Sequence, residues 1–108
     1  MYYYTPAYNN WTYAGTTPYP AYGGLRDDPV INGLIYFGYG QDNGVYYSSL
    51  YSYNPATATW SSALPQGTYP RDGVACGVIN YKLYVVGGRN SSANPDIQGL
   101  NYNEQFDP

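Results

Sequence analysis

The chain of 108 residues is long enough for one small domain, and its sparse charge limits the partners that it can bind. Four basic side chains against seven acidic ones give a net charge of −3. This balance argues against nucleic acid and against anionic membrane surfaces as partners, because both need clustered lysine and arginine. No apolar run approaches the length that a bilayer-spanning helix needs, so we expect no membrane insertion.

The first 22 residues form a segment rich in tyrosine and proline. Residues 1–25 hold seven tyrosines and no charged side chain. Tyrosine combines a large apolar face with a polar tip, which suits both sheet interfaces and contact surfaces. We expect these rings to pack along sheet edges, with a ligand platform as the alternative, and we expect an outer strand around Trp11.

Two β-hairpins follow along the chain. In the first, Asn32-Gly33 separates two apolar runs and suits the left-handed backbone angles of a tight turn. In the second, Asn80-Tyr81 stands between residues 74–79 and 82–86. Because tyrosine is a poorer residue for such angles than glycine, we expect a different turn type there.

Each hairpin leads into a glycine element, a polar loop and a third strand. The glycine elements are Gly38-Tyr39-Gly40 and Gly87-Gly88, and the third strands are predicted over 46–53 and 99–106. A Pro-Ala-Thr-Ala-Thr turn then leads into a fourth strand that carries Trp60. Four short antiparallel strands in this order, with almost no helix signal, predict a propeller blade.

The same pattern recurs with a period near fifty residues. Tyr4 leads to Trp11 as Tyr53 leads to Trp60, and Phe106-Asp107-Pro108 repeats the first part of that element. Repeated marks at one period indicate a repeat architecture. We therefore predict an all-β propeller segment in three parts: the outer-strand segment 1–22, blade one over 23–62, and blade two over 63–108 without its fourth strand.

These residues resemble the kelch repeat, whose marks are a double glycine after the second strand and then a Tyr and a Trp with six residues between them. The matching positions are Gly40, Gly87, Gly88, Tyr4, Trp11, Tyr53, Trp60 and Phe106. The resemblance implies a kelch-type β-propeller. It is closer still to the first two blades of the kelch-like oxidative-stress sensor adaptors, which present peptides to a cullin ubiquitin ligase.

In those adaptors, loop arginines bind acidic peptides, and the resemblance carries this role onto Arg89, with Ser91 as a neighbouring polar contact. The chain departs from the adaptor pattern at two positions. Asp72 stands where the adaptors have a small hydroxyl residue, and Gln41 where they have a tyrosine. A carboxylate facing an acidic ligand would repel it.

Nothing in the sequence points to catalysis, a metal or a cofactor. The chain has no histidine, which removes the commonest general base and the commonest metal ligand. The neighbouring carboxylates of Asp27 and Asp28 would point to opposite faces of a strand. The single cysteine, Cys76, lies in an apolar run and is expected to be a buried, unreactive thiol. We predict that the chain is not an enzyme.

We expect partner contacts to come from the blade loops. The expected residues are Tyr39, Gln41, Asp42, Asn43, Arg71, Asp72, Arg89, Asn90 and Ser91. For Arg71, a structural role as a hydrogen-bond donor between two blades is an equal alternative. Asn10 and Asn90 match the acceptor pattern for N-glycosylation, which matters only in a secreted protein.

Two blades are fewer than the four to eight of a closed propeller, and their flanks would be exposed. We therefore predict a module that self-associates into a ring or a filament, or that joins the remaining blades, and whose loops contact protein or glycan. The alternatives are a fragment of a ubiquitin-ligase adaptor, an extracellular fibre subunit, and the propeller part of a longer enzyme. The resemblance favours the cytoplasm, whereas the composition favours an extracellular protein.

Overall fold

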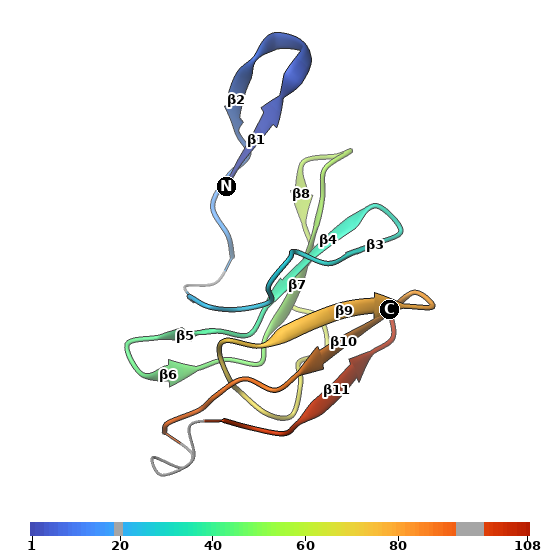
Figure 1. Ribbon diagram of the computed structural model, residues 1–108. Helices are drawn as coiled ribbons and strands as arrows, with labels where there is room; N and C mark the ends of the chain where they lie inside the picture. Colours follow the sequence, from blue (N-terminus) through green and yellow to red (C-terminus); the bar gives the residue numbers. More distant parts are fainter. Residues whose placement is uncertain (19–20, 93–98) are drawn as a thin grey trace.

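A computed structural model describes residues 1–18, 21–92 and 99–108 of the chain as a set of small antiparallel sheets. A hairpin made of β1 (Tyr2–Thr5) and β2 (Asn10–Tyr13) projects from one end, and two larger sheets pack against each other (Figure 1). The predicted all-β fold, with two antiparallel blades that do not close a ring in the described residues, is confirmed. The only helix in the described parts of the chain is the 3-10 turn Pro6–Tyr8, which is far too short to span a membrane.

Blade one is a four-stranded antiparallel sheet. Its strands are β3 (Val30–Ile31), β4 (Leu34–Gly38), β7 (Leu50–Asn54) and β8 (Thr59–Trp60), and they lie in that order across the sheet. The tight turn predicted at Asn32-Gly33 is confirmed, because both residues have positive φ angles, of 51° and 77°. The fourth strand pairs Trp60 with Tyr53, as the repeat pattern predicts.

The third strand of blade one begins later than the sequence suggests. Instead of running from Tyr46, it begins at Leu50, because a separate small hairpin precedes it. This hairpin joins β5 (Gln41–Asp42) to β6 (Val45–Tyr46) through an Asn43-Gly44 turn in which both φ angles are positive. The polar loop after the first glycine element is therefore an ordered β-ribbon.

In the described residues, blade two contains three strands. They are β9 (Ala75–Ile79), β10 (Lys82–Val86) and β11 (Asn103–Phe106), with β10 in the centre. The prediction of a different turn type between β9 and β10 is wrong, because Asn80 and Tyr81 adopt φ angles of 49° and 62°, close to those of Asn32 and Gly33. The twist of the paired strands selects this turn, and the exposed Tyr81 accepts the left-handed conformation that it imposes.

We expect Tyr81→Gly to raise the free energy of unfolding by about 1 kcal/mol, because glycine adopts positive φ without steric cost. The side chain is largely exposed, so little packing is lost. Urea denaturation checks the change. The matched control is Gly33→Tyr, which places a tyrosine at the equivalent turn position of blade one and should destabilise by a similar amount. A loss of stability on Tyr81→Gly would contradict the strained-turn interpretation.

The N-terminal hairpin has the same construction as the outer half of blade one. Tyr4 pairs with Trp11 as Tyr53 pairs with Trp60, and the ring centroids lie 5.4 Å and 5.1 Å apart. The connecting turns also match, since Asn9 and Ala58 take φ angles of 46° and 54°. The segment thus contains a third-strand equivalent, β1, in addition to the expected Trp11 strand.

The core lies between the two blades. It consists of side chains from both sheets and from the connections between them, namely Leu25, Ile31, Tyr36, Tyr39, Leu50, Val74, Leu83 and Val85. The ring of Tyr36 on β4 meets that of Phe106 on β11 at 5.9 Å between centroids. This junction fixes how the loops of the two blades come together.

Candidate functional site

The loops that follow the two glycine elements meet at one end of the blades, with residues 70–73 between them. The N–H of Gly40 donates to the carbonyl of Arg71, at 2.9 Å. Asp72 and Arg89 exchange two backbone hydrogen bonds, of 3.0 and 2.9 Å, as an isolated β-bridge. The connection between the blades thus holds both glycine elements in place.

Glycine is required where these backbones approach one another. A Cβ on Gly88, whose φ is +94°, would lie 2.7 Å from the carbonyl oxygen of Asp72. A Cβ on Gly40, whose φ is +96°, would lie 2.6 Å from the carbonyl oxygen of Tyr22. Both distances are too short for a real Cβ, so the expected role of these glycines rests on a close contact as well as on positive φ.

A polar pocket of about 520 Å³ opens at this end. It is lined by Gly23, Arg26, Asp72, Gly73, Gly88 and Arg89. The exposed Arg89 donates from Nε and Nη2 to the two carboxylate oxygens of the buried Asp72, at 2.9 and 3.3 Å. These hydrogen bonds, together with the carboxylate charge, raise the pKa of Arg89. Arg26 joins none of the ion pairs found in the described parts of the chain.

Hydrogen bonds also join the β5–β6 hairpin to the loop that follows the second glycine element. The hydroxyls of Tyr46 and Ser91 lie 2.8 Å apart, and the Ser92 hydroxyl donates to the carbonyl of Gly44 at 3.0 Å. The Gln41 side chain accepts from the N–H of Gly44, at 3.2 Å, and so closes the β5–β6 turn. The loop end is therefore an ordered surface built from both blades.

The nine predicted contact residues fall into three groups by burial. Asn43, Arg89 and Ser91 are exposed, and Gln41 and Asp42 are half-buried. The other four, Tyr39, Arg71, Asp72 and Asn90, are buried. The Asn90 side chain donates to the carbonyl of Pro70 at 2.6 Å and accepts from the N–H of Ser92 at 3.0 Å. Asn10 lies exposed on β2, and glycosylation at either asparagine stays a prediction.

Arg71 is the centre of a buried polar network between the blades. Its side chain is 0 % exposed. It donates to the carbonyls of Gly87, Tyr69 and Val85, at 2.6, 2.8 and 3.0 Å, and pairs with the Glu104 carboxylate. In this structure Arg71 ties the connection between the blades to strands β10 and β11.

Glu104 is the residue of this network that sequence reasoning missed. Its carboxylate accepts from Arg71, from the N–H of Thr68, and from the hydroxyl of Tyr39 at 3.0 Å. Partial burial by itself would raise the pKa of Glu104, but these hydrogen bonds outweigh it and the pKa is lowered. The available signal was a lone acidic residue on a third strand, at the position that Tyr51 occupies in blade one.

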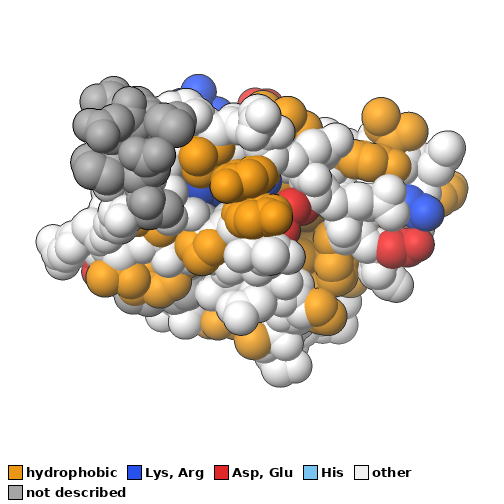
Figure 2. Space-filling model, turned by 90° about the horizontal axis from the view of Figure 1, so that it is seen from below, with side chains coloured by type: hydrophobic (Ala, Val, Ile, Leu, Met, Phe, Trp, Pro, Cys, Tyr) orange, Lys and Arg blue, Asp and Glu red, His pale blue; other side chains and the backbone are white. Residues whose placement is uncertain are grey.

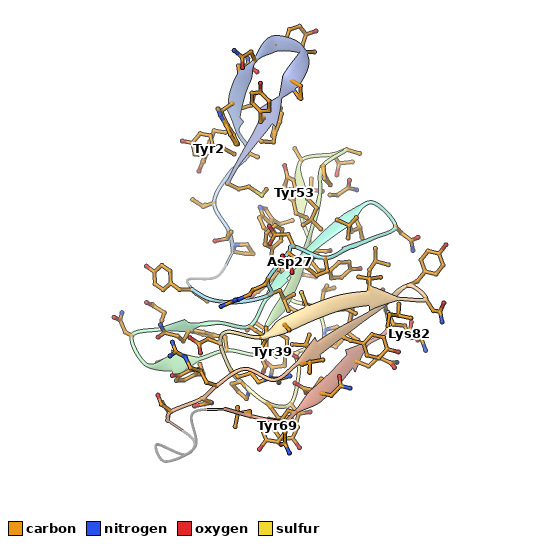
Figure 3. All side chains as sticks on the ribbon, in the orientation of Figure 1. Tyr2, Asp27, Tyr39, Tyr53, Tyr69 and Lys82 are labelled. Atoms are coloured by element: carbon orange, nitrogen blue, oxygen red, sulfur yellow. The ribbon has the colours of Figure 1, made fainter. Side chains whose placement is uncertain are left out.

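Tyr39 serves the same network from the other blade. It lies inside the molecule, whereas Tyr69 lies at its lower edge (Figure 3). Burial raises the pKa of the Tyr39 hydroxyl, and the neighbouring Glu104 carboxylate raises it further. The Arg71 guanidinium carbon lies 5.0 Å from the Tyr39 ring centroid. The ring is thus held by packing and charge, away from the polar pocket.

The described residues offer no assembled metal site. Within residues 1–18, 21–92 and 99–108, no three Asp, Glu, Cys or His side chains gather closely enough to hold a metal ion. Cys76 donates to the carbonyl of Arg26, and burial, followed by the charges of Asp27 and Asp28, raises the pKa of its thiol. The groups that the loop end offers for binding are the guanidinium of Arg26, the ion pair of Arg89 with Asp72, and the exposed amide of Asn43.

Comparisons with known proteins point to one repeat family. Residues 70–108 match the kelch motif. Over 95 residues, 84% of this chain, it is 34% identical to Kelch-like ECH-associated protein 1A of Danio rerio, and it spans 15% of that relative's length. Among solved structures, YjhT is similar with a TM-score of 0.59 and 27% identity, over 75% of this chain and 25% of that one.

Proposed function

This chain carries kelch repeats and folds as a segment of a kelch-type propeller, and from that premise we propose that it is a non-enzymatic module for binding and assembly. The proposal rests on one observation about the junction between the blades. The face that blade one buries at this junction is largely uncovered in blade two, and the face that blade two buries there is incompletely covered in blade one. The chain associates with further copies of itself through these two faces. Its loop end remains available for another partner.

The face that blade one turns toward blade two is almost completely buried. Ile31 and Tyr36 are 2 % and 3 % exposed, and Leu50 is buried with them. The equivalent face of blade two points away from blade one. There Ile79, which corresponds to Ile31, is 63 % exposed, and Tyr84, which corresponds to Tyr36, is half-buried. Blade two thus presents, uncovered, the same face that is buried in blade one.

The opposite faces are related in the same way. Leu83 and Val85 of blade two are buried against blade one. Their equivalents in blade one, Ile35 and Phe37, are only half-buried, and they line an apolar pocket of about 440 Å³ together with residues of the N-terminal hairpin. A second copy placed ahead of blade one would repeat the junction between the blades. Because the two faces differ, this association is head-to-tail and gives a ring if it closes and a filament if it does not.

The ordered loop end supports a second, separate contact. Arg26 and Arg89 line the polar pocket, but Asp72 offsets the charge of Arg89. This balance favours a partner segment with polar and neutral groups over a strongly acidic one. We assign this surface to a protein partner, with a glycan as the alternative. The remaining alternatives are a part of a ubiquitin-ligase adaptor, an extracellular fibre subunit, and a part of a longer enzyme.

Light scattering of the purified chain over a range of concentrations tests the assembly. We expect masses that are multiples of the single chain, and we expect Ile79→Asp to lower them by placing a charge on the proposed face. The matched control is Val45→Asp, which changes a similarly exposed apolar residue on β6, outside both faces. A wild-type chain that stays monomeric at all concentrations would sink the proposal, as would an equal effect of the two variants.

A further inference from the structure

Tyr69 and Tyr102 form a stacked pair of rings that belongs neither to the core nor to the polar pocket. Their ring centroids lie 3.8 Å apart, and the ring planes are only 8° from parallel. Aromatic pairs in proteins usually stand farther apart and are offset or tilted, as Tyr2 and Tyr13 are at 5.2 Å and 56°. Tyr69 and Tyr102 are therefore two phenols held face to face in van der Waals contact.

Backbone hydrogen bonds fix both members of this pair. The carbonyl of Tyr69 accepts from Nη1 of Arg71 at 2.8 Å, and the carbonyl of Tyr102 accepts from the N–H of Gly87 at 2.9 Å. Gly87 in turn accepts from Nε of Arg71 at 2.6 Å. The guanidinium carbon of Arg71 also lies 6.0 Å from the centroid of the Tyr102 ring. The buried arginine between the blades thus positions both tyrosines.

One ring of the pair is open to a small oxidant. Tyr69 is 42 % exposed, and Tyr102 is half-buried. Tyr69 lies at the lower edge of the molecule (Figure 3). Seen from below, the molecule carries hydrophobic side chains, a class that there includes tyrosine, with few charged groups between them (Figure 2). An oxidant that reaches Tyr69 therefore finds a second phenol in contact with the first.

We propose that Tyr69 and Tyr102 are the site of an intramolecular dityrosine crosslink, formed by a one-electron oxidant of the peroxidase class with hydrogen peroxide. Each phenol gives up one electron and its hydroxyl proton, and the two tyrosyl radicals join through a carbon–carbon bond between ring carbons next to those that bear oxygen. Each of these carbons then loses its hydrogen as a proton and each oxygen regains one, which restores both phenols. The two electrons and two protons released overall reduce one hydrogen peroxide to two water molecules.

The fold favours this pair over the other tyrosines, because rings already in contact react without the entropic cost of finding each other. The new bond closes a covalent loop from residue 69 to residue 102 around β9 and β10. Such a loop stabilises a protein, as a disulfide does, mainly by restricting the unfolded chain. The crosslink therefore raises the melting temperature. Both tyrosines belong to the same chain, so the site does not depend on the proposed self-association.

Treatment of the dilute 108-residue chain with a peroxidase and hydrogen peroxide tests the site. The monomer band from a denaturing gel is digested with trypsin, which sets aside any coupling between copies. Cleavage after arginine and lysine places Tyr69 in residues 27–71 and leaves Tyr102 as the only tyrosine of residues 90–108. We expect these two peptides to be joined with the loss of two hydrogens, and fragmentation in the mass spectrometer to locate the bond at Tyr69.

The variants Tyr69→Phe and Tyr102→Phe keep the stacked ring but remove one phenol, so each should abolish this product. The matched control, Tyr13→Phe, changes the tilted pair and should leave the product unchanged. Unfolding in urea should lower the product's share of all dityrosine about tenfold or more, because the contact is lost. Oxidised wild-type protein should also melt at a higher temperature than oxidised Tyr69→Phe.

Dominant coupling between other tyrosines of the folded monomer would overturn the proposal, as would an unchanged share of the product in urea. A crosslink from residues 90–108 that persists in Tyr69→Phe overturns it as well. So does a wild-type chain that forms no dityrosine while free tyrosine couples under the same conditions.

Discussion

Replacing Arg71 with methionine is expected to lower the free energy of unfolding by about 3–5 kcal/mol, because the change removes one partner of a buried ion pair. Arg71 is fully buried, and its loss leaves the Glu104 carboxylate without its cation. The carbonyls of Gly87, Tyr69 and Val85 lose their donor as well. Urea denaturation followed by circular dichroism measures the loss.

The control for Arg71 is an ion pair of the same charges at the surface. Lys82 and Asp107 lie 3.3 Å apart, and both side chains are substantially exposed. Exposed pairs contribute about 0–1 kcal/mol, so Lys82→Met should be nearly neutral. Equal losses in Arg71→Met and Lys82→Met would contradict a central structural role for the buried network. Near-wild-type stability of Arg71→Met would contradict it also.

Gly88→Ala is expected to lower the free energy of unfolding by about 2–5 kcal/mol, through a steric clash and an unfavourable backbone angle together. The added Cβ would lie 2.7 Å from the Asp72 carbonyl oxygen and 2.8 Å from a methyl carbon of Val74. Neither the backbone nor the fully buried Val74 can move away easily. Thermal denaturation gives the size of the loss.

Gly87→Ala separates the two contributions to that loss. Gly87 also has a positive φ, of 67°, but the heavy atom nearest to a Cβ added there would be the Leu100 carbonyl oxygen, at an ordinary 3.6 Å. This variant should therefore lower the free energy of unfolding through the unfavourable backbone angle alone, by about 1–2 kcal/mol. If Gly87→Ala lowered the free energy of unfolding more than Gly88→Ala, the close contact between Gly88 and Asp72 would not be the cause of the loss at Gly88.

The blade architecture could be predicted from the sequence because its marks are local and repeated. The spacing of Tyr53 and Trp60 predicts their pairing across a tight turn, and Asn32-Gly33 predicts a hairpin from two residues alone. The Asn80-Tyr81 turn could not be predicted in this way. Its conformation follows from the twist of β9 and β10, which overrides the preference of tyrosine.

The buried network lay beyond sequence reasoning because its partners are distant in the chain. Arg71 and Glu104 are 33 residues apart, and only the packing of the two blades brings them together. The loop residues were easier to predict from the sequence, since polar side chains after a glycine element are expected at a blade end. Sequence alone did not separate exposed Arg89 from buried Asp72, because that depends on how residues 70–73 thread between the blades.

Electron microscopy of the purified chain at its native concentration tests the central claim, that two exposed blade faces join one chain to the next. We predict closed rings or filaments built from two-blade units, because a head-to-tail junction repeats with every added copy. A field of isolated single chains, with no rings or filaments at any concentration, would contradict the claim.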